Sequence, residues 1–128
     1  MKLELVLVDD DEVLLTILEK MFLKVRSDVK ITLYNSGQKA LDHLTNTHSV
    51  SGKRFLLVDI YLNDMSGWDL LDELTKRNDA ASKVFILTSS VNPIHLETAK
   101  NYSQVIDFFE KPISFDKIHR IFELIEKE

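Results

Sequence analysis

Residues 5–12 read LVLVDDDE, an apolar run that leads directly into a group of acids. Three later apolar runs also lead into a polar residue: residues 55–58 precede Asp59, residues 84–87 precede Thr88, and residues 105–109 precede Lys111 after one further residue. Short, nearly continuous runs of Val, Ile, Leu and Phe indicate strands that are buried on both faces. The sequence therefore predicts buried strands, each with a chemically useful side chain near its carboxyl end.

The segments between these runs show helical periodicity. Residues 12–25 place apolar side chains at helical spacing, namely Leu14, Leu18, Met21 and Val25, joined by Ile17 and Phe22. Residues 29–34 alternate apolar and polar side chains instead, which predicts a half-exposed edge strand. Because strands separated by helices run parallel, their carboxyl ends meet at one edge of the sheet, where ligands bind in open sheets.

Four polar residues mark the starts of further helices. Ser36 can cap a helix that carries Ala40, Leu41 and Leu44, and Ser66 to Asp69 forms a capping box. Asn92 and Pro93 have the pattern of an N-cap followed by the first helical residue. Ser114 caps a last helix with the apolar stripe Phe115, Ile118, Ile121, Phe122 and Ile125.

The composition is typical of one soluble globular domain. The chain has 128 residues, of which 45% are hydrophobic and 29% are charged, and no cysteine, so disulfides and thiolate metal sites are excluded. No stretch approaches the length of about 20 apolar residues that spans a bilayer. The net charge of -5 opposes sequence-independent attraction to nucleic acid. We expect a single cytoplasmic domain over residues 1–128, with no secretory signal, no membrane partner and no nucleic acid partner.

The acids at the strand ends indicate a metal site. Asp9 and Asp10, facing Asp59, would repel one another unless a cation neutralised them, and hard oxygen ligands favour Mg²⁺. Lys111 and Thr88 supply an ammonium and a hydroxyl group, both suited to phosphate oxygens. Asp59 is the natural nucleophile, because a carboxylate can form an acyl phosphate. The set of residues predicts a site for phosphoryl groups.

Four motifs carry a family resemblance: LVLVDDDE at 5–12, LLVDIYLNDMSG at 56–67, LTSS at 87–90 and FFEKP at 108–112. With these motifs the chain resembles a receiver domain of the two-component response regulators, from Leu3 to the last helix. The resemblance implies a flavodoxin-like α/β fold, a doubly wound five-stranded parallel sheet of order 2-1-3-4-5 with helices on both faces. Because the sequence ends with the last helix, we expect a stand-alone receiver, similar to the chemotaxis regulators and without an output domain.

The resemblance also implies a role for each matching position. Asp59 matches the phosphoacceptor, and the expected metal ligands are Asp9, Asp10, Asp59 and the backbone carbonyl of Tyr61. Three more positions are expected to contact the phosphoryl group or to switch with it: Thr88, Lys111 and Phe108. Pro112 is a candidate for a cis peptide bond.

Two positions are expected to tune the lifetime of the phosphoryl group, because they lie two residues after Asp59 and two after Thr88. These are Tyr61 and Ser90. Three features depart from the usual pattern: Asn63 stands where proline is frequent, Ser66 precedes Gly67 where aspartate is frequent, and the usual glycine before the fifth strand is missing.

The implied function is that of a signalling phosphoacceptor. Such a protein takes a phosphoryl group from a histidine kinase or a histidine phosphotransfer protein, uses Mg²⁺, and changes its contacts with a downstream protein target. It is not an enzyme that acts on a separate substrate, although it assists its own phosphorylation and dephosphorylation. The sequence leaves open a direct regulator, a relay shuttle and a phosphate sink.

Two other classes of function are weighed against this one. A phosphorylation-independent interaction module is disfavoured because Asp59 and Lys111 are both present. A flavin-binding electron carrier would need a loop rich in Ser, Thr or Gly after the first strand, where three aspartates stand instead. A phosphatase with an aspartate nucleophile would need a second acid at the position of Tyr61.

For the remaining residues that could carry chemistry, the sequence predicts ordinary structural positions and no part in the site. Asp11 is expected to be a helix cap. The histidines His43, His48, His95 and His119 show no metal-ligand spacing and are expected at the surface. Trp68 and Tyr102 have no predicted role.

Overall fold

The computed structural model describes residues 2–46, 52–77, 83–89 and 91–128, in which strands and helices alternate. The strands are β1 (Lys2–Val8), β2 (Lys30–Tyr34), β3 (Gly52–Asp59), β4 (Lys83–Thr88) and β5 (Val105–Glu110). The helices are α1 (Glu12–Val25), α2 (Gly37–Asn46), α3 (Gly67–Lys76), α4 (Pro93–Ala99) and α5 (Phe115–Glu126). All strand pairs are parallel, in the order β2-β1-β3-β4-β5. The predicted doubly wound sheet is confirmed.

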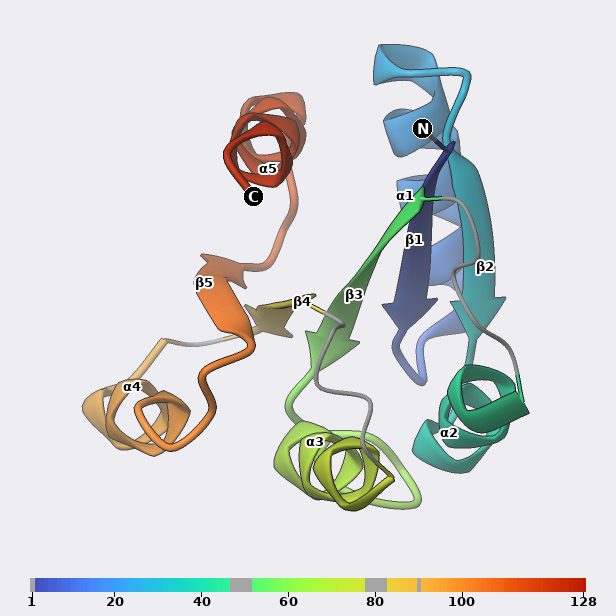
Figure 1. The fold of residues 1–128 in the computed structure, drawn as a ribbon. Coiled ribbons are helices and arrows are strands. Elements are labelled where there is room, and N and C mark those ends of the chain that lie inside the picture. The colour runs from blue at the N-terminus through green and yellow to red at the C-terminus, as the bar shows by residue number, and fades with distance from the viewer. Residues whose placement is uncertain (1, 47–51, 78–82, 90) are drawn as a thin grey trace.

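The sheet lies between two layers of helices (Figure 1). Helices α1 and α5 cover one face, and α2, α3 and α4 lie on the other. Successive side chains of β1 enter different cores: Leu5 and Leu7 pack with the residues of α1 and α5, while Val6 and Val8 pack with those of α2 and α3. Since a strand points alternate side chains to opposite faces, burial on both sides explains why its sequence is apolar without alternation. The edge strand β2 is only half-buried, as its alternating pattern predicts.

The predicted helix starts are confirmed by their capping bonds. Asp11 accepts a hydrogen bond from the backbone N–H of Leu14 at the start of α1, and Ser66 forms the capping box of α3 with Asp69. Asn92 caps α4, and Ser114 caps α5. Such caps satisfy backbone N–H groups that have no partner within the helix.

The apolar face of α1 differs from the prediction. Its fully buried residues are Leu15, Leu18 and Phe22, whereas Ile17 is exposed. A helix turns by about 100° per residue, so a stripe centred on Leu18 and Phe22 leaves Ile17 on the flank. Phe115, at the first position of α5, is likewise exposed, because it lies ahead of the buried stripe that continues through Ile118.

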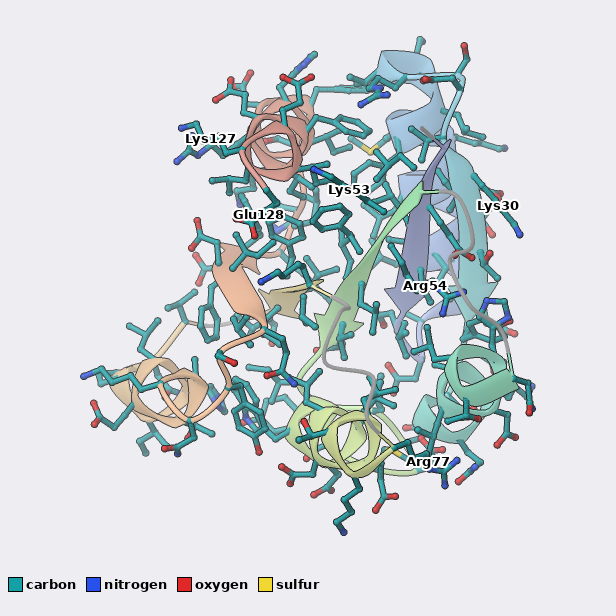
Figure 2. All side chains as sticks on the ribbon, in the orientation of Figure 1. Lys30, Lys53, Arg54, Arg77, Lys127 and Glu128 are labelled. Carbon is teal, nitrogen blue, oxygen red and sulfur yellow. The ribbon has the colours of Figure 1, made fainter. Side chains whose placement is uncertain are left out.

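A charged pair joins β1 to β3 near the amino ends of these strands. Glu4 and Arg54 are direct register partners, both are buried, and the Arg54 Nε–H donates a hydrogen bond of 2.9 Å to Glu4 Oε1. His43 of α2 is half-buried, with Nε2 3.5 Å from Glu4 Oε2, so the prediction that His43 is a surface residue was wrong. Figure 2 shows Arg54 on the side of the sheet that faces α2, while its neighbour Lys53 points to the side of α5 and Glu128.

The ionised form of Glu4 is favoured by this arrangement. Burial alone would raise its pKa, but the hydrogen bond and the charge of Arg54 outweigh burial, with help from Lys30 and His43, so the pKa of Glu4 is lowered. Ionised Glu4 therefore contributes stability above its unfolded-state pKa of about 4.3, and this contribution is lost as the pH falls through the lower folded-state pKa.

Replacing Arg54 with alanine should lower the free energy of unfolding by about 3 kcal/mol at pH 7, because a buried carboxylate loses its guanidinium. Urea denaturation measures this loss. The difference in free energy of unfolding between the parent and the variant should narrow as the pH falls to about 4, because a protonated Glu4 no longer needs a cation. A double variant, Glu4→Leu with Arg54→Met, serves as the control and should recover most of the loss, since it buries no charge. A double variant as unstable as Arg54→Ala would contradict the role of this pair.

Candidate functional site

The carboxyl ends of three central strands lie side by side. Val8 of β1 pairs with Val58 of β3, so Asp9 and Asp59 follow paired residues. Asp59 in turn pairs with Leu87 of β4, the residue before Thr88. The parallel register thus brings the polar strand ends to one edge of the sheet, as the sequence predicts.

Three carboxyl groups cluster at this edge. Asp9, Asp10 and Asp59 each offer an oxygen, and these oxygens all lie within 4.8 Å of one another. Asp9 is 1% exposed and Asp59 is 7% exposed, while Asp10 is half-buried and open to incoming ligands. Carboxylate oxygens at this spacing fit a small, hard cation such as Mg²⁺, which takes one or two carboxylates and keeps several waters.

One ammonium group links two of the carboxylates. Lys111 Nζ donates hydrogen bonds of 2.6 Å to Asp9 Oδ2 and 3.0 Å to Asp59 Oδ2. Burial disfavours the charged amine, but the bonds to Asp9 and Asp59 outweigh burial and raise the pKa of Lys111, which holds it in the ammonium form. Lys111 contacts two of the three carboxyl groups, so among the described residues the cluster holds an excess of acid that a divalent cation can balance.

The second oxygen of each buried carboxylate is held by the backbone. The N–H of Asp11 donates to Asp9 Oδ1 at 2.9 Å, and the N–H of Tyr61 donates to Asp59 Oδ1 at 3.3 Å. Each carboxylate is therefore oriented by two donors, one backbone amide and the Lys111 ammonium. Charge-assisted hydrogen bonds of this kind fix geometry more firmly than neutral ones do.

The remaining predicted residues lie around this cluster. Thr88 is buried at the end of β4, where its carbonyl accepts a bond of 2.8 Å from the N–H of Lys111, and the Lys111–Pro112 peptide bond is cis. Phe108 of β5 is half-buried, with its ring 6.3 Å from that of Trp68. Tyr61 is 61% exposed beside Asp59, whereas Ser90 lies outside the described residues.

Two residues after β3 fix the loop that carries Tyr61. Gly67 donates its N–H to the carbonyl of Ile60 at 2.7 Å, and a Cβ at this position would lie 2.7 Å from the carbonyl oxygen of Asp59, so only glycine fits without a shift. Asp64 accepts bonds of 2.9 Å from the N–H groups of both Gly37 and Gln38 at the start of α2. Burial opposes ionisation of Asp64, but these backbone bonds outweigh it and lower its pKa. The sequence did not reveal this cap, because its partners are 26 and 27 residues away.

An aromatic cluster beside the site was also missed. Trp68 of α3 stacks on Tyr102, with ring centroids 5.2 Å apart, and Tyr102 donates its O–H to Asp72 Oδ1 at 2.8 Å. His95 of α4 is 9% exposed and packs beside Trp68, so the prediction that it lies at the surface was wrong. Its burial depends on rings from α3 and the β3–α3 loop, which periodicity within α4 cannot indicate. His119 is exposed as predicted, and His48 lies outside the described residues.

Comparison with known structures supports this fold. A two-component response regulator from Legionella pneumophila is 25% identical, with a TM-score of 0.84 over 99% of this chain and 100% of that chain. The signal receiver domain of a putative Luxo repressor protein from Vibrio parahaemolyticus is 27% identical, with a TM-score of 0.81 over 99% and 92%. The chemotaxis protein CheY4 from Vibrio cholerae shares the fold at 12% identity, with a TM-score of 0.81 over 96% and 98%.

The chain was also compared with curated proteins and with protein families. No curated protein matches the chain. Among the described residues, no helix has the length and apolar character needed to cross a membrane. The family model of the response regulator receiver domain matches residues 5–123, which includes all four strand ends of the site. The chain therefore belongs to the family of response regulator receiver domains.

Proposed function

We propose that Asp59 is the phosphoacceptor of a signalling receiver that takes its phosphoryl group from a histidine kinase or a histidine phosphotransfer protein. The observation that supports this most directly is the placement of Lys111 Nζ, which contacts both Asp9 and Asp59 at the edge of the sheet. Asp10 completes the carboxyl group cluster and is only half-buried. An ammonium group and two further carboxylates, which can hold a cation, beside one nucleophilic carboxylate form an arrangement suited to phosphoryl transfer.

The chemistry follows from the atoms present. A carboxylate oxygen of Asp59 forms a bond to phosphorus, and the bond from phosphorus to the donor imidazole breaks, so the electron pair leaves with the imidazole. Lys111 stays charged and would contact the oxygens of the arriving group, with Asp59 held in place by the N–H of Tyr61. Bound Mg²⁺, held by Asp9, Asp10, Asp59 and the Tyr61 carbonyl, would supply positive charge that balances the phosphoryl oxygens.

The product would act as a signal through protein contacts. Thr88 lies on β4 and Phe108 on β5. A phosphoryl group at Asp59 would favour the conformation in which both side chains turn toward it, and this change would alter the surface that a partner contacts. We propose a cytoplasmic protein that assists its own phosphorylation and dephosphorylation and has no separate substrate. Its downstream target would be a protein that distinguishes the two conformations.

Acetyl phosphate with Mg²⁺ should add one phosphoryl group to the protein, and the adduct should map to Asp59. Intact-mass and peptide mass spectrometry measure the label. EDTA should prevent it, Asp59→Asn should abolish it, and Asp10→Ala should reduce Mg²⁺ affinity in calorimetry because one ligand is lost. Asp11→Asn is a matched control, since Asp11 caps α1 and asparagine also caps helices. Labelling that persists in Asp59→Asn would contradict the assignment.

Thr88→Ala should separate phosphorylation from switching. The variant should still be labelled at Asp59, because Lys111 and the carboxyl groups remain, but its NMR shifts in α4 and β5 should respond less to beryllofluoride than those of the parent. Thr88→Ser keeps the hydroxyl group and should respond as the parent does. An equal response in Thr88→Ala would show that this hydroxyl does not carry the switch.

Tyr61→Asn should shorten the lifetime of the phosphorylated protein. Hydrolysis needs a water held in line with phosphorus, and an amide can orient that water, whereas the tyrosine ring is bulky and its phenol lies far out. A phosphate-release assay on labelled protein measures the decay, which should take minutes or longer in the parent. Decay at or below the parent rate in Tyr61→Asn would refute the role of this side chain.

A further inference from the structure

The phenol of Tyr61 is hydrogen-bonded to a buried histidine on another element. Tyr61 Oη lies 3.0 Å from His95 Nε2, and the two rings meet edge to face with centroids 5.7 Å apart. Tyr61 belongs to the loop after β3, whereas His95 belongs to α4, which follows β4. The contact therefore joins the residue beside the phosphoacceptor directly to α4.

His95 is held firmly enough to fix this contact. Its backbone N–H donates to the side chain of Asn92 at 3.1 Å, which places it in the capped first turn of α4. Its ring lies 6.5 Å from that of Trp68, which is itself stacked on Tyr102. His95 is 9% exposed, so the protein around it restrains its ring as a partner for the phenol.

The described residues make few other contacts with the Tyr61 side chain. Tyr61 is 61% exposed, so the packing of the described residues leaves its ring free to change rotamer unless the phenol is bonded. Its backbone is fixed, because the N–H donates to Asp59 Oδ1 and the residue bridges to Ser66. The bond to His95 is thus the contact that sets the position of the exposed ring.

We infer that His95 is a positioning residue of the phosphorylation site: it holds the Tyr61 ring in one rotamer beside Asp59, and α4 thereby controls the access of water to the phosphoryl group. The inference rests on the proposed function of Asp59. A fixed ring blocks one approach to phosphorus, whereas a released ring samples rotamers that admit an in-line water. Any partner that shifts α4 would then change the lifetime of the signal through the Tyr61–His95 bond.

Four variants test this coupling through the rate of phosphate release from protein labelled with acetyl phosphate. His95→Phe keeps an aromatic ring without a bonding nitrogen, and Tyr61→Phe keeps the ring without its hydroxyl. Each should speed release about 2- to 10-fold, the effect of losing one neutral hydrogen bond. The double variant should be no faster than either single variant, because both changes remove the same bond. His95→Gln retains hydrogen-bonding groups and should restore a rate close to that of the parent.

The outcomes separate this inference from the proposed function. If the parent protein takes no label at Asp59, the proposed function fails and the inference fails with it. If the label forms but the single variants decay at the parent rate or more slowly, or their effects multiply in the double variant, only the role of His95 is overturned. The thermal unfolding of each variant is measured beside its rate of phosphate release. If a loosened fold alone speeded release, His95→Gln and His95→Phe would release phosphate at similar rates.

Discussion

The contact of one ammonium with two buried carboxylates is the constraint on which the site depends. Lys111 Nζ reaches Asp9 from β1 and Asp59 from β3, although Lys111 itself follows β5 at the far edge of the sheet. This geometry requires parallel strands whose register aligns their carboxyl ends, a sheet order that places β1 beside β3, and a chain path after β5 that turns back toward the centre. The sheet order, the register of β1 on β3 and the turn after β5 together bring these three side chains into contact.

The sequence predicts this part of the molecule well, because the signals are local. An apolar run without alternation indicates a strand buried on both faces, and the residue after the run must then lie at the carboxyl edge, as Asp9 and Asp59 do. Capping residues such as Ser66 and Asn92 mark helix starts within three residues, so they too are visible locally. The chemistry of the edge follows from residue type once the strands are placed.

The parts that could not be predicted depend on contacts between distant segments. Asp64 caps the start of α2, with partners 27 and 26 residues earlier in the chain, and His95 is buried by rings from α3 and the β3–α3 loop. Neither contact leaves a periodic pattern, because each involves one side chain on a loop or on a short helix. The exposed position of Ile17 has a related cause. The packing of α1 against α5 decides which apolar residues of α1 are buried, and the sequence alone is compatible with more than one buried face.

Buried charge is balanced differently at the two ends of the central strands β1 and β3. Near the amino ends, Glu4 meets Arg54 across β1 and β3, so an anion is balanced by a cation of the protein itself. Near the carboxyl ends, three carboxyl groups cluster, and among the described residues the Lys111 ammonium contacts two of them. A buried charge without its partner is destabilising, so the excess of acid at this end favours a bound cation, as the proposed function requires. The same two strands thus combine a fixed structural ion pair with the proposed site for Mg²⁺ and a phosphoryl group.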